Sequence, residues 1–212
     1  MKTERTTVKR LPERARYDTE TLYAILDEAP ICTVAFVRDG APVAIPTIHG
    51  RAGDTLYLHG SKASGMLNAL SNGAETCVTA TILDGYVLAR SVFHHSMNYR
   101  SAVVLGRARE VTDPDEKLDA MRVVTEHVAP GRWDEARRPS TKEIAATKIV
   151  AIPIEEASAK VRTGPPKDDD EDHDVPVWAG VLPVRTVAGE PVEDSSGATP
   201  TPALQRLRDT LR

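Results

Sequence analysis

The sequence predicts a mainly β protein, an antiparallel barrel with a few short helices at its periphery. Apolar, β-branched runs recur along the chain, tight turns with glycine separate several of them, and helical spacing is confined to short stretches. The 212 residues are 41% hydrophobic. This composition is enough to bury a core, and the length suits one compact domain with an extension.

Six strands are expected. The first spans residues 31–37, and the turn Asp39-Gly40 returns the chain into a second strand over residues 43–48. Pro46 cannot donate a ladder hydrogen bond, so this second strand belongs at an edge, a bulge or a barrel rim. The remaining four strands are expected at residues 56–58, 75–83, 99–111 and 148–154, the last extending toward Val161.

The expected helices have recognisable starts. Asp18 is a plausible cap for a helix that ends at Pro30, and Ser64 for a shorter one that closes at Asn72-Gly73. A third helix is expected to begin at Thr112-Asp113-Pro114, with proline at its first position. A fourth is expected over residues 141–147.

The expected domain organisation has four parts. They are an N-terminal arm (residues 1–16), a barrel domain (17–163), an acidic linker followed by an apolar Trp-Ala-Gly-Val segment that packs back on the barrel (164–185), and a loosely ordered tail (186–212).

Composition argues against several classes of function, namely nucleic-acid binding, zinc binding and membrane association. The net charge of −4 argues against a nucleic-acid-binding surface. Cys32 and Cys77 lie in apolar runs and are expected to be buried thiols, without zinc-ligand spacing. Because no apolar stretch reaches about 18 residues and the N-terminus lacks an apolar signal core, we expect a soluble, cytoplasmic protein without a membrane partner.

The segment His59–Gly65, called the cradle here, joins a predicted strand to a predicted helix. Its small residues allow close backbone approach, Ser61 and Ser64 add hydroxyls, and Lys62 adds a positive charge. Unpaired N–H groups at a helix start favour anions. The segment is therefore either a phosphate site or an ordinary capped helix start.

A second polar segment, Phe93–Ser101, leads into an apolar strand. Arg100 and Ser101 open that strand, and Arg100 could bind the same phosphate bidentately or form a surface salt bridge. His94 and His95 are the acid–base candidates of this segment, or loop residues without a ligand.

These two segments, with Leu105–Ala108, Ala159–Pro166 and Pro176–Val181, resemble the pyridoxamine 5'-phosphate oxidase-related flavin-binding proteins, in particular their nitroimidazole-reductase-like branch. The resemblance covers roughly residues 10–185. It implies a six-stranded split barrel that binds FMN non-covalently, as a homodimer with FMN at the interface.

The resemblance also implies roles for individual residues. Ile45, Pro46 and Thr47 would lie along the flavin ring, His59 and Gly60 would flank the ring or ribityl chain, and Trp178 would approach the flavin from either subunit or anchor the tail in the core. The residues that the resemblance implies around the phosphate are Ser64, Gly65, Met66, Arg100 and Ser101, with Lys160 and Arg162 as weaker candidates, and the cradle itself adds Ser61 and Lys62. Met66 departs from the family pattern, in which many members carry a basic residue there, and Lys62 is the expected substitute.

The leading hypothesis is an FMN-dependent oxidoreductase that moves electrons from NADH or NADPH to a small-molecule substrate. A flavin-binding module without turnover is the first alternative, and a deazaflavin is an alternative to FMN. A haem-binding split barrel, with His94 or His95 on the iron, is the second. The cradle argues against a haem-binding split barrel, because haem has no phosphate for such a segment to bind.

Overall fold

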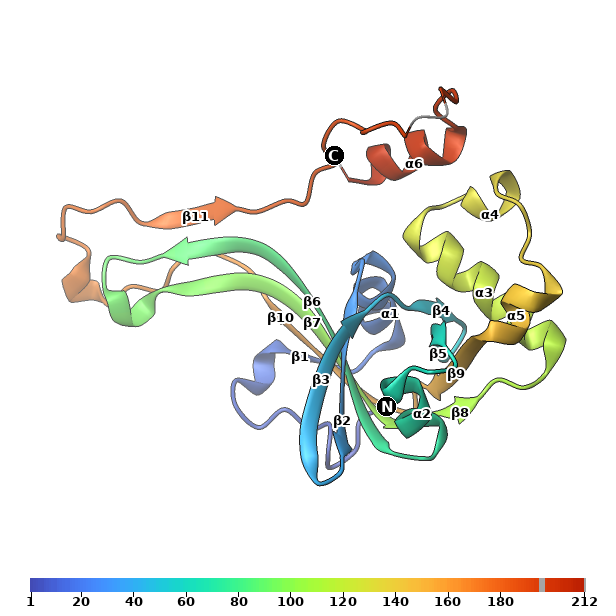
Figure 1. The fold of residues 1–212 in the computed structure, drawn as a ribbon. Coiled ribbons are helices and arrows are strands. Elements are labelled where there is room, and N and C mark those ends of the chain that lie inside the picture. The colour runs from blue at the N-terminus through green and yellow to red at the C-terminus, as the bar shows by residue number, and fades with distance from the viewer. Residues whose placement is uncertain (195–196, 212) are drawn as a thin grey trace.

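The computed structural model describes residues 1–194 and 197–211 and is built on two antiparallel sheets (Figure 1). The larger sheet runs in the order β1-β10-β7-β6-β2-β3, with β11 paired to β6, and the smaller runs β4-β5-β9-β8. The predicted class, a mainly β antiparallel barrel with few helices, is confirmed. The strands are β1 (Ala15–Arg16), β2 (Cys32–Arg38), β3 (Ala41–Thr47), β4 (Gly50–Ala52), β5 (Thr55–Ser61), β6 (Glu75–Leu88), β7 (Ser96–Arg107), β8 (Arg109–Glu110), β9 (Thr147–Pro153), β10 (Glu156–Arg162) and β11 (Gly180–Pro183).

The helices begin at the residues whose side chains can cap them. Asp18 accepts a hydrogen bond from Thr21 N, and Ser64 accepts one from Leu67 N. Asp113 caps the third helix with Pro114 at its first position, and Ser140 forms a capping box with Glu143. The helices are α1 (Thr19–Glu28), α2 (Gly65–Ser71), α3 (Pro114–Val128), α4 (Arg132–Glu135), α5 (Thr141–Ala146) and α6 (Pro202–Thr210).

Each face of the smaller sheet is covered by a different layer. Leu56 and Leu58 of β5 point into the barrel core, where they join side chains from α1, α2 and the larger sheet. Tyr57 points to the opposite face and packs under Val124 of α3. Because side chains alternate along a strand, His59 lies on the same outer face as Tyr57, beneath α3.

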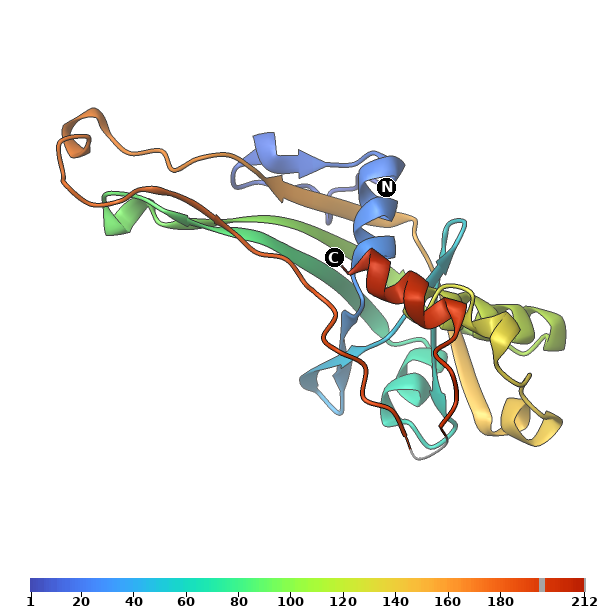
Figure 2. The same cartoon turned by 90° about the horizontal axis from the view of Figure 1, so that it is seen from above.

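The hairpin formed by β6 and β7 extends well beyond the barrel (Figures 1 and 2). Its outer part, residues 85–98, is called the projecting hairpin. At its base the register shifts between Leu83 and Gly85, and β11 pairs alongside. An added Cβ at Gly85 would lie 2.9 Å from the carbonyl oxygen of Leu182, so glycine permits this close strand approach.

The structure differs from the sequence predictions at several boundaries. The strand expected over 99–111 is β7 followed by the separate β8, and the one expected from 148 toward Val161 is two strands in different sheets, β9 and β10. Leu11–Arg16 of the N-terminal arm form a short helical turn and then β1 on β10. The tail expected to be loosely ordered contains α6, whose Ala203 is buried.

Candidate functional site

The cradle connects the end of β5 to the start of α2. Ser61 Oγ accepts a hydrogen bond from Ala63 N at 3.1 Å, and Ser64 Oγ accepts one from Leu67 N at 3.3 Å. Ser61 and Lys62 are exposed, and no ion pair of Lys62 occurs in the described part of the chain. The cradle therefore presents hydroxyls and a positive charge to solvent.

Arg38, at the end of β2, is a cradle neighbour that sequence reasoning missed. An added Cβ at Gly65 would lie 3.0 Å from its Nη1 atom. Within the described residues no carboxylate pairs with Arg38, in contrast to most arginines of this chain. In the sequence, Arg38 is marked only by its position next to the Asp39-Gly40 turn. That position does not predict that Arg38 lies near the start of α2.

Ile45, Pro46 and Thr47 lie on β3, at the end of the strand order of the larger sheet. They pair with β2 opposite Val34, Thr33 and Cys32. Pro46 is exposed and occupies an edge strand, as its missing N–H predicts. This edge leaves backbone groups available to a ligand.

Arg100 does not face the cradle as an unpaired cation. Its guanidinium donates hydrogen bonds to Glu28, one of them at 2.8 Å, and to Asp84 at 2.7 Å. These two carboxylates, Glu28 foremost, raise the pKa of Arg100. The expectation that Arg100 binds a phosphate is not supported by this geometry, because a phosphate would have to displace or approach two negative charges.

Four other phosphate candidates have structural partners. Met66 is buried in the core with 7% exposure, so its side chain cannot reach a phosphate. Ser101 Oγ donates to Lys160 O, and Lys160 Nζ donates to Arg10 O. Arg162 is buried and donates to Asn98 Oδ1 and to backbone oxygens of residues 164 and 165.

His59 lines a cavity of about 520 Å³ between the outer face of β5 and the helices α3 and α4, called the His59 cavity here. Most of its lining is apolar, with the larger side chains those of Ile48, Met121, Val124, Val128, Trp133 and Pro139. Within the described residues, His59 Nδ1 is buried and has no hydrogen-bond partner. Burial lowers the pKa of His59, which keeps the ring neutral near pH 7.

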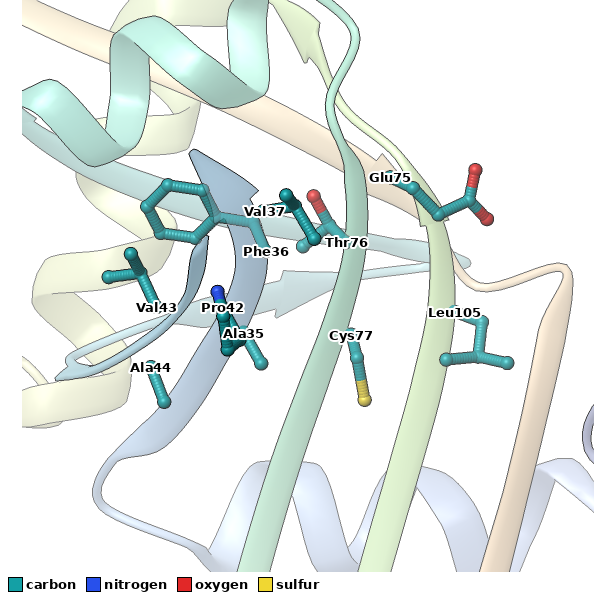
Figure 3. Close-up of a pocket in the computed structure, with 10 residues that line it drawn as sticks. All are labelled: Ala35, Phe36, Val37, Pro42, Val43, Ala44, Glu75, Thr76, Cys77 and Leu105. Atoms are coloured by element: carbon teal, nitrogen blue, oxygen red, sulfur yellow. The ribbon is translucent and has the colours of Figure 1, made fainter. Parts of the chain in front are cut away.

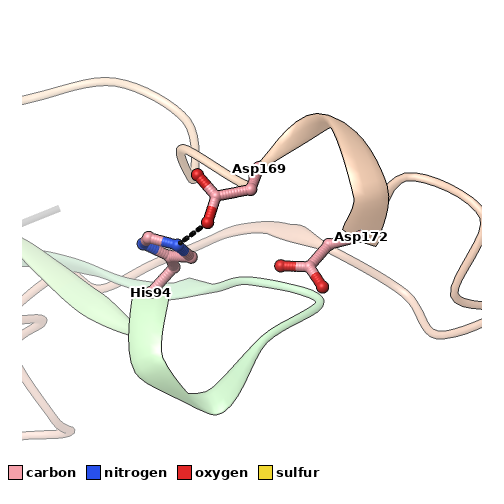
Figure 4. A group of neighbouring side chains, drawn as sticks. All are labelled: His94, Asp169 and Asp172. Carbon is pink, nitrogen blue, oxygen red and sulfur yellow. Dashed lines mark hydrogen bonds and ion pairs between the residues drawn. The ribbon is translucent and has the colours of Figure 1, made fainter.

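His94 and His95 lie at the tip of the projecting hairpin. His94 Nε2 is 3.0 Å from an Asp169 carboxylate oxygen, and Asp172 is close by (Figure 4). His95 Nδ1 donates to Ser91 O. Asp168 is paired with Arg90 at 2.8 Å, so the acidic segment is held against the hairpin.

Trp178 is 65% exposed, which excludes the core-anchor alternative. Its ring packs over Gly180, where an added Cβ would lie 2.8 Å from a ring carbon. Trp178 precedes β11, which pairs with β6 beside the projecting hairpin, whereas no hydrogen bond among the described residues joins the cradle to the hairpin tip or to Trp178.

A second, more open hollow of about 370 Å³ lies on the larger sheet (Figure 3). Its lining is almost entirely apolar, with Phe36, Val37 and Val43 from the β2–β3 hairpin and Cys77 from β6. Burial raises the pKa of Cys77, so this thiol stays protonated.

The fold and these sites define a class of protein, and comparison with known proteins agrees. Residues 18–161 match the family model described as pyridoxamine 5'-phosphate oxidase, and the chain belongs to this family. The resemblance seen in the sequence is thereby confirmed. A search of curated proteins found no match.

Two solved structures are similar over nearly their whole length. The flavocytochrome Anf3 from Azotobacter vinelandii is 40% identical, with a TM-score of 0.90 and coverage of 97% of both chains. An FAD and haem binding protein from Mycobacterium smegmatis is also 40% identical, with a TM-score of 0.88 and coverage of 92% of this chain and 97% of that one.

A 5-nitroimidazole antibiotic resistance protein from Bacteroides thetaiotaomicron shares the fold. It is 24% identical, with a TM-score of 0.59, and covers 69% of this chain and 86% of its own. Among the described residues, no helix is both long and apolar enough to cross a lipid bilayer.

Proposed function

We propose that this protein is an oxidoreductase that binds both a flavin and a haem. The observation that carries the proposal is its similarity, at 40% identity and over nearly the full chain, to a flavocytochrome and to an FAD and haem binding protein. The proposed function therefore includes both a flavin and a haem, which were treated as alternatives when only the sequence was considered.

The cradle is the proposed site of the flavin phosphates. Lys62 and Arg38 supply positive charge, and the hydroxyls of Ser61 and Ser64 supply hydrogen bonds. Gly65 allows the Arg38 guanidinium to approach the start of α2. The exposed edge of β3 at Ile45–Thr47 is the proposed neighbour of the flavin ring.

FAD is the favoured flavin, in place of the expected FMN, because the M. smegmatis relative is an FAD-binding protein. A dinucleotide carries two phosphates, which suits a site with two cations. A bound flavin accepts a hydride and releases single electrons, which suits a one-electron iron centre. NADH or NADPH remains the proposed donor, and the acceptor is a small molecule.

A homodimer is the proposed assembly. The projecting hairpin and the adjacent segment expose large apolar side chains, among them Phe93 at 85% and Trp178 at 65%. A soluble monomer rarely exposes this much apolar surface in one place. Phe93→Ser should shift the molar mass in light scattering toward the monomer, whereas an unchanged mass would place the interface elsewhere.

The experiment that tests the function has two steps. Denaturing the purified protein should release a flavin with the mass of FAD, and FMN alone would restore the original expectation. Anaerobic NADH or NADPH should then bleach the flavin bands of the native protein. Failure of both donors to bleach them would favour a flavin-binding module without turnover.

A further inference from the structure

The His59 cavity has the dimensions and lining of a site for a large apolar ligand. Its volume of about 520 Å³ falls within the range of small-molecule and cofactor sites, about 300–1,000 Å³. One wall is β5 with His59, and the opposite wall is α3 with Met121, Val124 and Val128. Trp133 of α4 adds a flat aromatic surface.

His59 has no structural role that accounts for its place. Its Nδ1 atom is buried without a partner, although buried polar groups are nearly always hydrogen-bonded. His49 Nδ1 is likewise buried without a partner in the described residues, but His49 Nε2 donates to Leu26 O and His127 Nε2 to Ala29 O, whereas no hydrogen bond of His59 occurs at either ring nitrogen. A neutral imidazole that lines a cavity can ligate a metal through an unpaired ring nitrogen.

Two cations lie at the rim of the same cavity. Arg132 and Arg137 are among its lining residues, with side chains 49% and 71% exposed. Each already binds a carboxylate, Arg132 at 3.5 Å from Glu135 and Arg137 at 2.8 Å from Glu143. Both guanidinium groups are largely exposed, so carboxylates of a ligand whose apolar body lies inside would exchange with these surface partners, of which Glu143 also lines the cavity.

We propose that the His59 cavity is the haem site, with His59 as an axial ligand and with Arg132 and Arg137 at the propionates. This assignment rests on the proposed function, which requires a haem but does not place it. It replaces His94 and His95, the ligands considered from the sequence. Those residues lie at an exposed hairpin tip, where His94 Nε2 is bonded to Asp169 and His95 Nδ1 to Ser91 O.

The assignment would place the two cofactors close together in one chain. His59 lies two residues before Ser61 on β5, so their Cα atoms are about 7 Å apart along the strand. Because His59 is itself the first residue of the cradle, the haem and the flavin would be bound next to each other on one short segment. The haem would use His59 and the cavity beneath α3, and the flavin phosphates would use Ser61, Lys62, Ser64 and Arg38. The two cofactors therefore would not share binding residues.

The test compares three histidine variants in protein produced with added haem precursor, with haem measured by the pyridine haemochrome assay and flavin by absorbance. His59→Ala should lower the haem content at least tenfold and retain most of the flavin, because the flavin phosphates are assigned to Arg38, Ser61, Lys62 and Ser64 and not to the imidazole. Free imidazole should restore a Soret band to this variant, because it refills the ligand position. His94→Ala and His95→Ala should keep the haem content and Soret position of the wild type.

Retained flavin bands and an unchanged melting temperature report that His59→Ala is folded. If that variant does not fold, His59→Met provides the second test, since a thioether ligand should retain haem with a shifted Soret band. A wild-type Soret band in either His59 variant would overturn the site while leaving the proposed function intact. Wild-type protein without any haem would overturn both.

Discussion

The ring of His49 lies 4.4 Å from the ring of His127, and each imidazole donates a hydrogen bond to a carbonyl near the end of α1. The two donor–acceptor distances are 2.8 Å to Leu26 O and 3.0 Å to Ala29 O. This pair ties α1 to the last turn of α3, which also forms one wall of the His59 cavity.

Burial lowers the pKa of His49 to about 4, and it lowers the pKa of His127 as well. The unfolded chain binds these protons near pH 6.5, so between about pH 6.5 and 4 it holds more protons than the folded chain. The stability that depends on neutral His49 is complete above pH 6.5 and is lost as the pH falls toward 4. The free energy of unfolding should decrease by up to about 1.4 kcal/mol per pH unit for this group.

Urea unfolding at about pH 7 and about pH 5 measures this dependence. His49→Gln is the matched control, because its amide can donate to Leu26 O and does not titrate. The variant should be less sensitive to acid than the wild type. An equal loss of stability in both proteins would show that His49 does not cause the pH dependence.

Arg100→Ala should destabilise the fold, because it leaves the partly buried Asp84 without its partner. The expected cost is about 1–3 kcal/mol in thermal unfolding, the range for a buried group left unsatisfied. Flavin content should stay at the wild-type level, since Arg100 is engaged by two carboxylates. A variant of normal stability that loses its flavin would instead restore the phosphate role expected from the sequence.

Arg38→Ala and Lys62→Ala should each weaken flavin retention. A lost charge-assisted contact costs about 1.5–3 kcal/mol, which corresponds to roughly tenfold or more in affinity. Flavin release during dialysis at rising salt concentration measures the effect. Arg185→Ala, at an exposed residue of the tail, is the control. Wild-type retention in both cradle variants would place the phosphates elsewhere.

The C-terminal helix holds one wall of the His59 cavity in place. Glu135 of α4 accepts a hydrogen bond from Ala203 N at 2.7 Å, and Arg206 Nε donates to Pro130 O at 3.0 Å. Both views show α6 beside α4, which carries Trp133 (Figures 1 and 2). Removing this clamp should therefore loosen the cavity wall.

Glu135→Ala should release haem to apomyoglobin several times faster than the wild type does, with little change in flavin content. Glu190→Ala, which removes an exposed partner of Arg208 on the same helix, is the control and should release haem at the wild-type rate. If the two variants release haem equally, α6 does not support the cavity.

Local chemistry explains why much of the fold could be predicted from the sequence. The caps at Asp18 and Ser64, the Asp39-Gly40 turn and the edge strand at Pro46 each follow from the geometry that one residue type permits. The split of the last predicted strand into β9 and β10 could not be read in this way. Both halves are apolar, and only the tertiary structure decides which sheet each one joins.

The candidate site likewise has parts that local sequence predicts and parts that depend on long-range contacts. The cradle is one continuous segment, so its place between a strand and a helix could be predicted from local sequence, and its role as a phosphate site stays a prediction. The approach of Arg38 to Gly65 and the acidic partners of Arg100 join residues far apart in sequence. The His59 cavity needs α3 and α4 as well as β5, and a single histidine in a strand carries no sign of what covers it.

The absorption spectrum of the purified protein, recorded before and after reduction by dithionite, tests the central claim most directly. The account predicts a Soret band together with flavin absorption in the oxidised protein, both surviving desalting, and loss of the flavin bands on reduction. A spectrum with flavin bands and no Soret band, or with a Soret band and no releasable flavin, would contradict it.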